Sequence, residues 1–139
     1  MNPVYILSAT RTAVGSFGGS LKDTSPIDLG THIAKSAIER SGVAADAIDH
    51  AVIGNVIHTE PRDMYVSRCI SIGAGMREGA PALTVNRLCG SGLQAIASAS
   101  QLIMLGDAEL ALAGGVEVMS RSGHIVPSLR WGERMGNAD

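Results

Sequence analysis

The chain has 139 residues, 45% of them hydrophobic, and its 11 basic and 13 acidic side chains give a net charge of −2. This composition predicts one soluble globular unit, or a piece of a larger one, and excludes an intrinsically disordered chain. The two signs of charge are well mixed, which excludes a basic stripe for nucleic acid and a cationic face for a membrane, so we expect neither partner.

The N-terminal MNPVYILSATRTAVG has no basic residue before its short apolar run, and no stretch approaches the roughly 18 consecutive apolar residues of a membrane span. We therefore expect a cytoplasmic protein. The two cysteines, Cys69 and Cys89, form no CxxC motif and no Cys/His cluster with zinc spacing. The sequence predicts reduced thiols, no disulfide and no bound metal.

Apolar runs of strand length alternate with longer helical patterns along the chain, which is typical of an α/β fold. Residues 4–7 are predicted to form a first, buried strand, followed by a loop that contains Gly15, Gly18 and Gly19. The loop lacks the G-x-G-x-x-G spacing of a dinucleotide-binding turn and the lysine of a P-loop. We therefore expect no phosphate site there.

A helix is predicted to begin at Ser25, because serine can cap it, Pro26 suits its first turn and Asp28 follows three residues after the cap. Gly42 is expected to end it. Its predicted apolar face consists of Ile33, Ala34, Ala37 and Ile38.

The nearly continuous apolar run at residues 51–57 predicts a strand covered on both faces. A shorter helix is predicted over residues 62–72, with Cys69 on its apolar side and therefore in the core. Two further short strands are predicted at residues 82–85 and 110–113.

A last helix is predicted from Gly90 to Gly106, with one apolar stripe along its length. The residues of this stripe are Leu93, Ile96, Ala97, Ser100, Ile103 and Met104. After Met119 neither a stripe nor an alternation is sustained, which indicates that a different region begins there.

Cys89 stands where the strand at residues 82–85 passes into this last helix. At a helix N-terminus, unpaired backbone N–H groups and the positive end of the helix dipole stabilise an anion. The pKa of cysteines so placed is lowered from about 8.5 toward neutrality, and the thiolate is the reactive form. Gly90 and Gly92 leave room for a substrate carbonyl, and the same N–H groups can hold an oxyanion. The sequence predicts a candidate nucleophile, with an inert buried thiol as the alternative.

The segment VNRLCGSGLQAI, followed by GDAELALAGGVEVMS, resembles the thiolases, which are enzymes of acetyl-CoA acyl transfer. The N-terminal VYILSATRTAVGSFGGSL and the C-terminal HIVPSLRWGERMG extend the resemblance to nearly the whole chain. Between them, GNVIHTEPRDMYVSR is most similar to β-ketothiolases of broad chain-length specificity.

The resemblance implies an acyl-CoA:acetyl-CoA C-acyltransferase, in which Cys89 takes an acyl group from an acyl-CoA and forms a thioester. Acetyl-CoA or free CoA then completes condensation or thiolysis, so coenzyme A esters are substrates and no cofactor is implied. The family's catalytic histidine and second cysteine match no residue here. His32 and His50 are expected to be packing or surface residues. His58 ends the strand predicted at residues 51–57, before the segment that lies near the dimer interface in the family, and His124 matches a histidine of the family's loop region. We assign none of the four as the catalytic base.

The resemblance also implies a fold. Residues 1–118 are expected to form a thiolase-like N-terminal α/β domain, with a mostly parallel mixed sheet and helices packed on it, and residues 119–139 the beginning of the loop domain. The apolar strands need cover from a separate C-terminal half, a second protomer, or both. We expect a homodimer or tetramer, with residues 62–72 and 82–85 at a two-fold interface, and a place in fatty acid metabolism.

Two alternatives to a thiolase remain open. The chain could be a non-catalytic dimerisation or interaction subunit, a truncated relative of the thiolases, although such a module has no need of a thiol at a helix N-terminus. It could also be a ketosynthase-like condensing enzyme, which shares the fold and the nucleophilic cysteine, but the flanking motifs tell against this reading.

Overall fold

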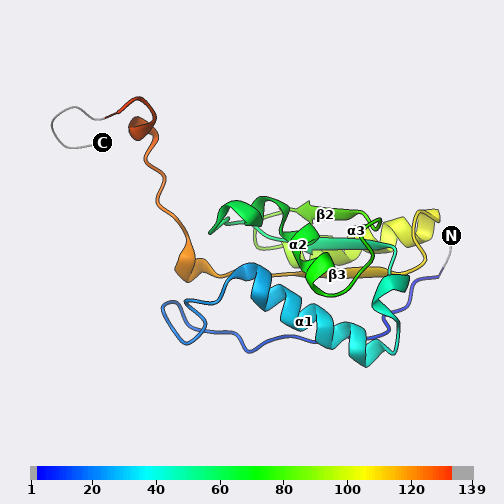
Figure 1. The fold of residues 1–139 in the computed structure, drawn as a ribbon. Helices are drawn as coiled ribbons and strands as arrows, with labels where there is room; N and C mark the ends of the chain where they lie inside the picture. The colour runs from blue at the N-terminus through cyan, green and yellow to red at the C-terminus, as the bar shows by residue number, and fades with distance from the viewer. Residues whose placement is uncertain (1–2, 133–139) are drawn as a thin grey trace.

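The computed structural model describes residues 3–132 of the chain. Helices and strands alternate along it (Figure 1). In chain order they are α1 (Pro26–Ser41), β1 (His50–Gly54), α2 (Val66–Gly73), β2 (Ala82–Val85), α3 (Ser91–Leu105) and β3 (Ala111–Gly115). The predicted α/β fold is confirmed.

The three strands form one parallel sheet with β1 in its centre, β2 on one side and β3 on the other. The antiparallel pairing expected of a mixed sheet is not found within residues 3–132. Successive residues of β1 face opposite sides of the sheet. Ala51 and Ile53 pack toward α1 and α2, while Val52 packs against α3.

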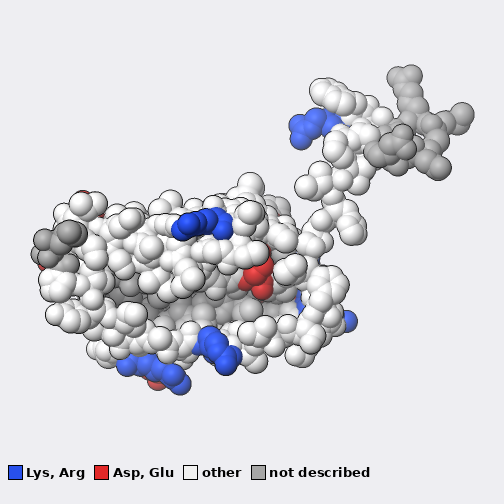
Figure 2. All heavy atoms as spheres, turned by 180° about the vertical axis from the view of Figure 1, so that it is seen from behind, with Lys and Arg blue, Asp and Glu red and all other residues white. Residues whose placement is uncertain are grey.

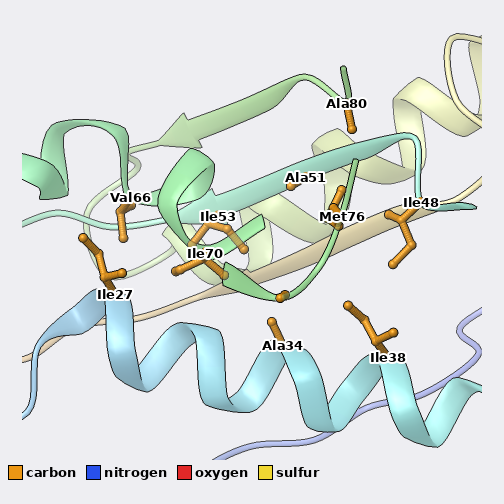
Figure 3. Packing of buried hydrophobic residues seen from close by; sticks show 11 residues of the cluster. Ile27, Ala34, Ile38, Ile48, Ala51, Ile53, Val66, Ile70, Met76 and Ala80 are labelled. Carbon is orange, nitrogen blue, oxygen red and sulfur yellow. The ribbon is translucent and has the colours of Figure 1, made fainter. Parts of the chain in front are cut away.

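The larger core lies between α1, α2 and the sheet. Figure 3 shows Ile27, Ala34 and Ile38 of α1 pointing toward Ile70 of α2 and toward the sheet. The predicted ends of α1 are confirmed, because the Ser25 hydroxyl accepts a hydrogen bond from the Asp28 N–H at 3.0 Å. At the other end, Gly42 has the left-handed φ of 72° expected of a C-terminal cap.

The predicted strand at residues 4–7 is wrong. The segment runs alongside α1 without joining the sheet (Figure 1), and Tyr5 and Ile6 are 76% and 79% exposed. Directly after it, the Ser8 hydroxyl donates a hydrogen bond of 2.7 Å to the Ala37 carbonyl of α1. A strand requires a partner for its backbone groups, and no strand within residues 3–132 lies beside this segment to supply one.

The apolar stripe predicted for α3 does not face the core. The buried residues are Ser91, Ala95 and Ala99, whereas Leu93 is 77% exposed. The small side chains of these buried residues let α3 lie close to the sheet. The side of the helix that carries its larger apolar residues is therefore exposed. Ile96, also in the predicted stripe, is likewise exposed.

The region predicted as one helix at residues 62–72 divides into a 3₁₀ turn at Pro61–Tyr65 followed by α2. Cys69 is partly buried against the larger core rather than enclosed in it. The predicted core position of Cys69 is therefore found at the margin of the core and not in its interior.

Two strands have boundaries other than those predicted. β1 ends at Gly54 rather than residue 57, because the N–H groups of Val56 and Ile57 donate to the Glu117 carboxylate, each at 3.0 Å. β3 extends to Gly115 rather than residue 113. A side chain thus takes the hydrogen bonds that a longer β1 would have offered to a neighbouring strand.

The chain leaves the α/β body near the predicted division at residue 118. Arg121 is still attached, since its guanidinium donates to the Asp23 carbonyl and to Glu60. The segment after it extends away from the body (Figure 1). The division into residues 1–118 and 119–139 stays a prediction, and residues 133–139 lie outside the described residues.

Within the described part of the chain, the stretch Leu88–Leu105 meets the length and composition of a membrane-crossing helix, with a mean hydropathy of 1.3. The expectation that no such stretch exists considered only runs of consecutive apolar residues. The mean hydropathy of this stretch is high although it also contains serine and glutamine. In the fold this stretch comprises the Cys89 turn and α3, which packs on the sheet through Ala95 and Ala99. Composition alone is therefore weak evidence for a membrane segment.

Candidate active site

Cys89 lies in the tight turn between β2 and α3, as predicted. The helix begins two residues later at Ser91, with Gly90 as its N-terminal cap, and the Cys89 side chain is exposed. Cys89 is therefore not a buried thiol in this structure. Cys69 is the more enclosed of the two thiols, and burial raises its pKa above the usual value.

Hydrogen bonds within the turn use two of the N–H groups expected to face an anion. The Gly90 N–H donates to the Arg87 carbonyl at 3.1 Å, and the Ser91 N–H donates to the Leu88 carbonyl at 3.0 Å. These bonds shape the turn around Cys89. They also mean that neither group is free to hold an oxyanion in this conformation.

The start of α3, directly after the Cys89 turn, sits on the carboxyl ends of β1 and β3 because two glycines lie beneath it. A β-carbon at Gly54 would stand 2.6 Å from the carbonyl carbon of Ser91, and one at Gly115 would stand 3.1 Å from the Cα of Gly92. Any larger residue at Gly54 would displace the start of α3. The position of Cys89 relative to the sheet thus depends on the end of β1.

A second polar cluster occupies the carboxyl ends of β1 and β3, and the sequence analysis missed it. The Asn55 amide donates to the Val116 carbonyl at 2.9 Å and to a Glu117 carboxylate oxygen at 3.1 Å. Asn55 is buried, and its carbonyl oxygen Oδ1 has no protein partner among the described residues. The sequence does contain a signal for this cluster, because Asn55 and Glu117 each follow an apolar strand closely. Residues at the carboxyl ends of parallel strands meet at one edge of the sheet.

The histidines give Cys89 no evident base. His32, His58 and His124 are exposed, and His50 is half-buried at the start of β1. Its Nδ1 lies 3.2 Å from the Ala51 carbonyl oxygen. No hydrogen bond joins any of these imidazoles to Cys89 within residues 3–132. No group of three or more His, Cys, Asp or Glu side chains in the same residues could hold a metal ion.

A long groove of about 890 Å³ separates the N-terminal segment from the sheet. Its walls come from residues 3–17, from α1, from β3 and from Ile96 and Ile103 of α3. Figure 2 shows a hollow that crosses this side of the molecule and is bordered mainly by uncharged atoms. Cys89 is not part of its lining, so this groove is not the room for a substrate carbonyl that is expected beside Gly90 and Gly92.

The geometry can be compared with known proteins. The family model "Thiolase, N-terminal domain" matches residues 4–139. The chain belongs to the thiolase family. The resemblance carried by the segment around Cys89 therefore extends over nearly the full sequence.

Individual thiolases are similar over almost all of this chain but over only a third of their own length. The β-ketothiolase BktB of Cupriavidus necator is 55% identical over 97% of the chain and 34% of that protein. The mitochondrial 3-ketoacyl-CoA thiolase of Homo sapiens is 37% identical over 96% of the chain and 34% of that protein. This chain thus spans about a third of the relatives that it matches.

Solved thiolase structures have the same fold in this region. The human mitochondrial 3-ketoacyl-CoA thiolase in complex with CoA superposes with a TM-score of 0.91 at 37% identity, over 96% of this chain and 34% of that one. The Bacillus anthracis acetyl-CoA acetyltransferase superposes with a TM-score of 0.90 at 35% identity. The expected thiolase-like N-terminal fold is confirmed.

Proposed function

We propose that this chain is the N-terminal portion of an acyl-CoA:acetyl-CoA C-acyltransferase of the β-ketothiolase type, with Cys89 as its nucleophile. The observation that carries the proposal is the exposed thiol in the turn before α3, in a chain of the thiolase family. The 55% identity to a β-ketothiolase supports this branch of the family.

The chemistry that Cys89 can perform is acyl transfer between thiols. Its thiolate attacks the thioester carbonyl of an acyl-CoA, the bond between that carbonyl carbon and the CoA sulfur breaks, and CoA leaves as a thiolate that takes up a proton. The acyl group is then held on the Cys89 sulfur as a thioester. A free CoA thiolate, or the α-carbon of acetyl-CoA after loss of a proton, attacks that thioester and releases Cys89.

A second part of the polypeptide is needed for turnover. The first step requires a base that takes the proton from the Cys89 thiol, and no hydrogen bond joins a histidine to Cys89 among the described residues. Condensation requires a second base, for the α-carbon of acetyl-CoA. The groove beside β3 and the exposed apolar side of α3 are surfaces that a downstream half would cover. We therefore propose that the chain acts together with such a half, joined to it or separate.

The remaining features of the proposal are expectations from the sequence and from the resemblance to thiolases. Acyl-CoA and CoA are the substrates, with no resident cofactor or metal, and neither nucleic acid nor a membrane is a partner. The protein is cytoplasmic, takes part in fatty acid metabolism, and assembles as a homodimer or tetramer. The free edge of β2 and the adjoining Pro61–Tyr65 turn and α2 form the two-fold interface.

One observation favours a second candidate function. The apolar groove and the exposed side of α3 also suit a non-catalytic interaction subunit, which would use these surfaces and leave Cys89 idle. The two functions differ in what acetyl-CoA does to the chain. An acyltransferase is expected to take up an acetyl group selectively at Cys89, whereas an interaction subunit is not.

The test is acetylation of the chain by acetyl-CoA, followed by peptide mapping. We expect a thioester at Cys89 that free CoA removes, no modification in Cys89→Ser, and unchanged modification in the matched control Cys69→Ser. An acetyl group that never appears, or that appears equally at Cys69, would favour the interaction subunit.

A further inference from the structure

Leu88, the residue before Cys89, has an uncommon backbone conformation. Among residues 3–132 it is the one residue other than glycine with a positive φ, at 49°. Residues with a β-carbon keep this left-handed conformation only where their surroundings enforce it. The Leu88 side chain is 70% exposed, so its own packing does not enforce it. The enforcement comes from polar groups around the backbone.

The Ser91 hydroxyl is one such group, beside the Ser91 N–H, which donates to the Leu88 carbonyl at 3.0 Å. The hydroxyl donates a hydrogen bond of 2.6 Å to the Leu88 carbonyl and accepts one of 2.9 Å from the Arg87 N–H. Ser91 is only 5% exposed, so water does not compete freely for these bonds. One buried hydroxyl therefore ties the first residue of α3 to the two residues that precede Cys89.

The hydroxyl is itself held in place by the sheet. A β-carbon at Gly54 would stand 2.8 Å from the Ser91 β-carbon, which shows how closely this side chain lies over the end of β1. The exposed Asn86 side chain adds one more hydrogen bond, because its Oδ1 accepts the Leu88 N–H at 3.0 Å. The backbone on both sides of Cys89, at Leu88 and at the start of α3, is therefore held by hydrogen bonds.

We propose that Ser91 is a positioning residue for the Cys89 thiol. Its hydroxyl holds Leu88 in the left-handed conformation, and this conformation turns the Cys89 sulfur outward at the end of the sheet. Without the hydroxyl, Leu88 can relax to a negative φ, and the thiol no longer presents itself in one orientation. The inference rests on the proposed function, in which Cys89 is the group that is acylated.

The test measures the alkylation rate of Cys89 by iodoacetamide in the folded chain at neutral pH, with Cys69 as the internal reference. Ser91→Ala is expected to slow alkylation of Cys89 about fivefold or more while leaving Cys69 unchanged. The matched control is Ser100→Ala, which removes a hydroxyl from the same helix that donates to the Ile96 carbonyl at 2.8 Å. This control is expected to leave both rates unchanged.

Two further variants separate positioning from simple loss of stability. Ser91→Thr keeps a hydroxyl and is expected to restore the rate. Leu88→Asn added to Ser91→Ala is expected to recover part of it, because asparagine adopts the left-handed conformation more readily than leucine does. Thermal unfolding of each variant shows whether reactivity merely follows stability.

An unchanged Cys89 rate in Ser91→Ala would overturn the inference, as would an equal loss at both cysteines or a failure of both restoring variants. A parent chain whose Cys89 reacts no faster than Cys69 would overturn the proposed function together with this inference. A reactive Cys89 that is indifferent to Ser91→Ala would count against the positioning role alone.

Discussion

Gly54 at the end of β1 lies directly against Ser91 at the start of α3, and a β-carbon on Gly54 would be 2.6 Å from the Ser91 carbonyl carbon. The atom it would strike belongs to the backbone, so a side-chain rotation cannot relieve the clash. The end of the central strand and the start of the helix that follows Cys89 are therefore one packed unit.

Gly54→Ala is expected to destabilise the chain by about 3 kcal/mol, the upper end of the usual cost of overpacking. The same substitution at Gly114 is the control, because a β-carbon there would meet no atom within 4 Å. Urea unfolding measures both. Equal stabilities for the two variants would show that the helix start can move away from β1 at little cost.

The two thiols are expected to differ in reactivity. Burial raises the pKa of the Cys69 thiol, so a smaller fraction of it is thiolate at neutral pH, and Cys89 is exposed. A small haloacetamide at neutral pH should label Cys89 well before Cys69 in the native chain. Peptide mapping measures the order, and equal labelling or labelling of Cys69 first would contradict the assignment of Cys89 as the nucleophile.

Asp49 is expected to make the stability of the fold depend on pH. Its carboxylate accepts the N–H groups of Glu109 and Leu110 and the Arg77 guanidinium, and these bonds lower its pKa below the ordinary 3.8. Because the folded-state pKa is lowered, the stabilisation is fully present above about pH 4 and is lost as the pH falls through the lowered value.

Asp49→Asn should therefore reduce the free energy of unfolding by about 1 to 2 kcal/mol at neutral pH, and by progressively less below about pH 4. Asp46→Asn, at an exposed position three residues earlier, is the matched control. Chemical unfolding at several pH values tests the prediction. A deficit in Asp49→Asn that stays constant down to pH 2 would contradict it.

The free edge of β2 is expected to pair with a second copy of the chain. β2 is an edge strand, and Leu83 on it is 45% exposed. Light scattering at micromolar concentration should show a dimer, which Leu83→Lys should dissociate. Ile125→Lys, in the segment that extends away from the body, is the control and should leave the dimer intact. A stable monomer in the parent chain would refute this interface.

The sequence predicted the ends of a helix correctly where the capping residue lies next to the helix in the chain. The caps of α1 at Ser25 and Gly42 are of this kind, and so is Gly106 at the end of α3. Cys89 could be placed correctly for the same reason, because a short strand and a glycine-rich helix start flank it within a few residues.

The features that the sequence analysis missed depend on distant parts of the chain. Residues 4–7 have the composition of a strand, but composition does not show whether a partner strand lies beside them. The end of β1 is decided by Glu117, more than sixty residues away, whose carboxylate takes the amides of Val56 and Ile57. The buried side of α3 is its small side, around Ala95 and Ala99, because close approach to the sheet outweighs the hydrophobicity of larger residues on the other side.

The central claim is that Cys89 carries an acyl group in a thiolase reaction that a downstream half completes. The most direct measurement is thiolysis of acetoacetyl-CoA by CoA, followed as loss of the absorbance of the Mg²⁺ enolate. The 139-residue chain alone is expected to show no activity, because the absent acid and base groups typically contribute about 10² to 10⁴ each.

A downstream half of a thiolase, carrying its histidine and second cysteine, should restore activity when it is supplied in trans. Cys89→Ala should abolish the restored activity, and the control Cys69→Ala should retain it. Activity that survives Cys89→Ala would contradict the central claim. Strong activity from the chain alone that Cys89→Ala abolishes would contradict the need for a second half and would make His58 and His124 the first candidates for the base.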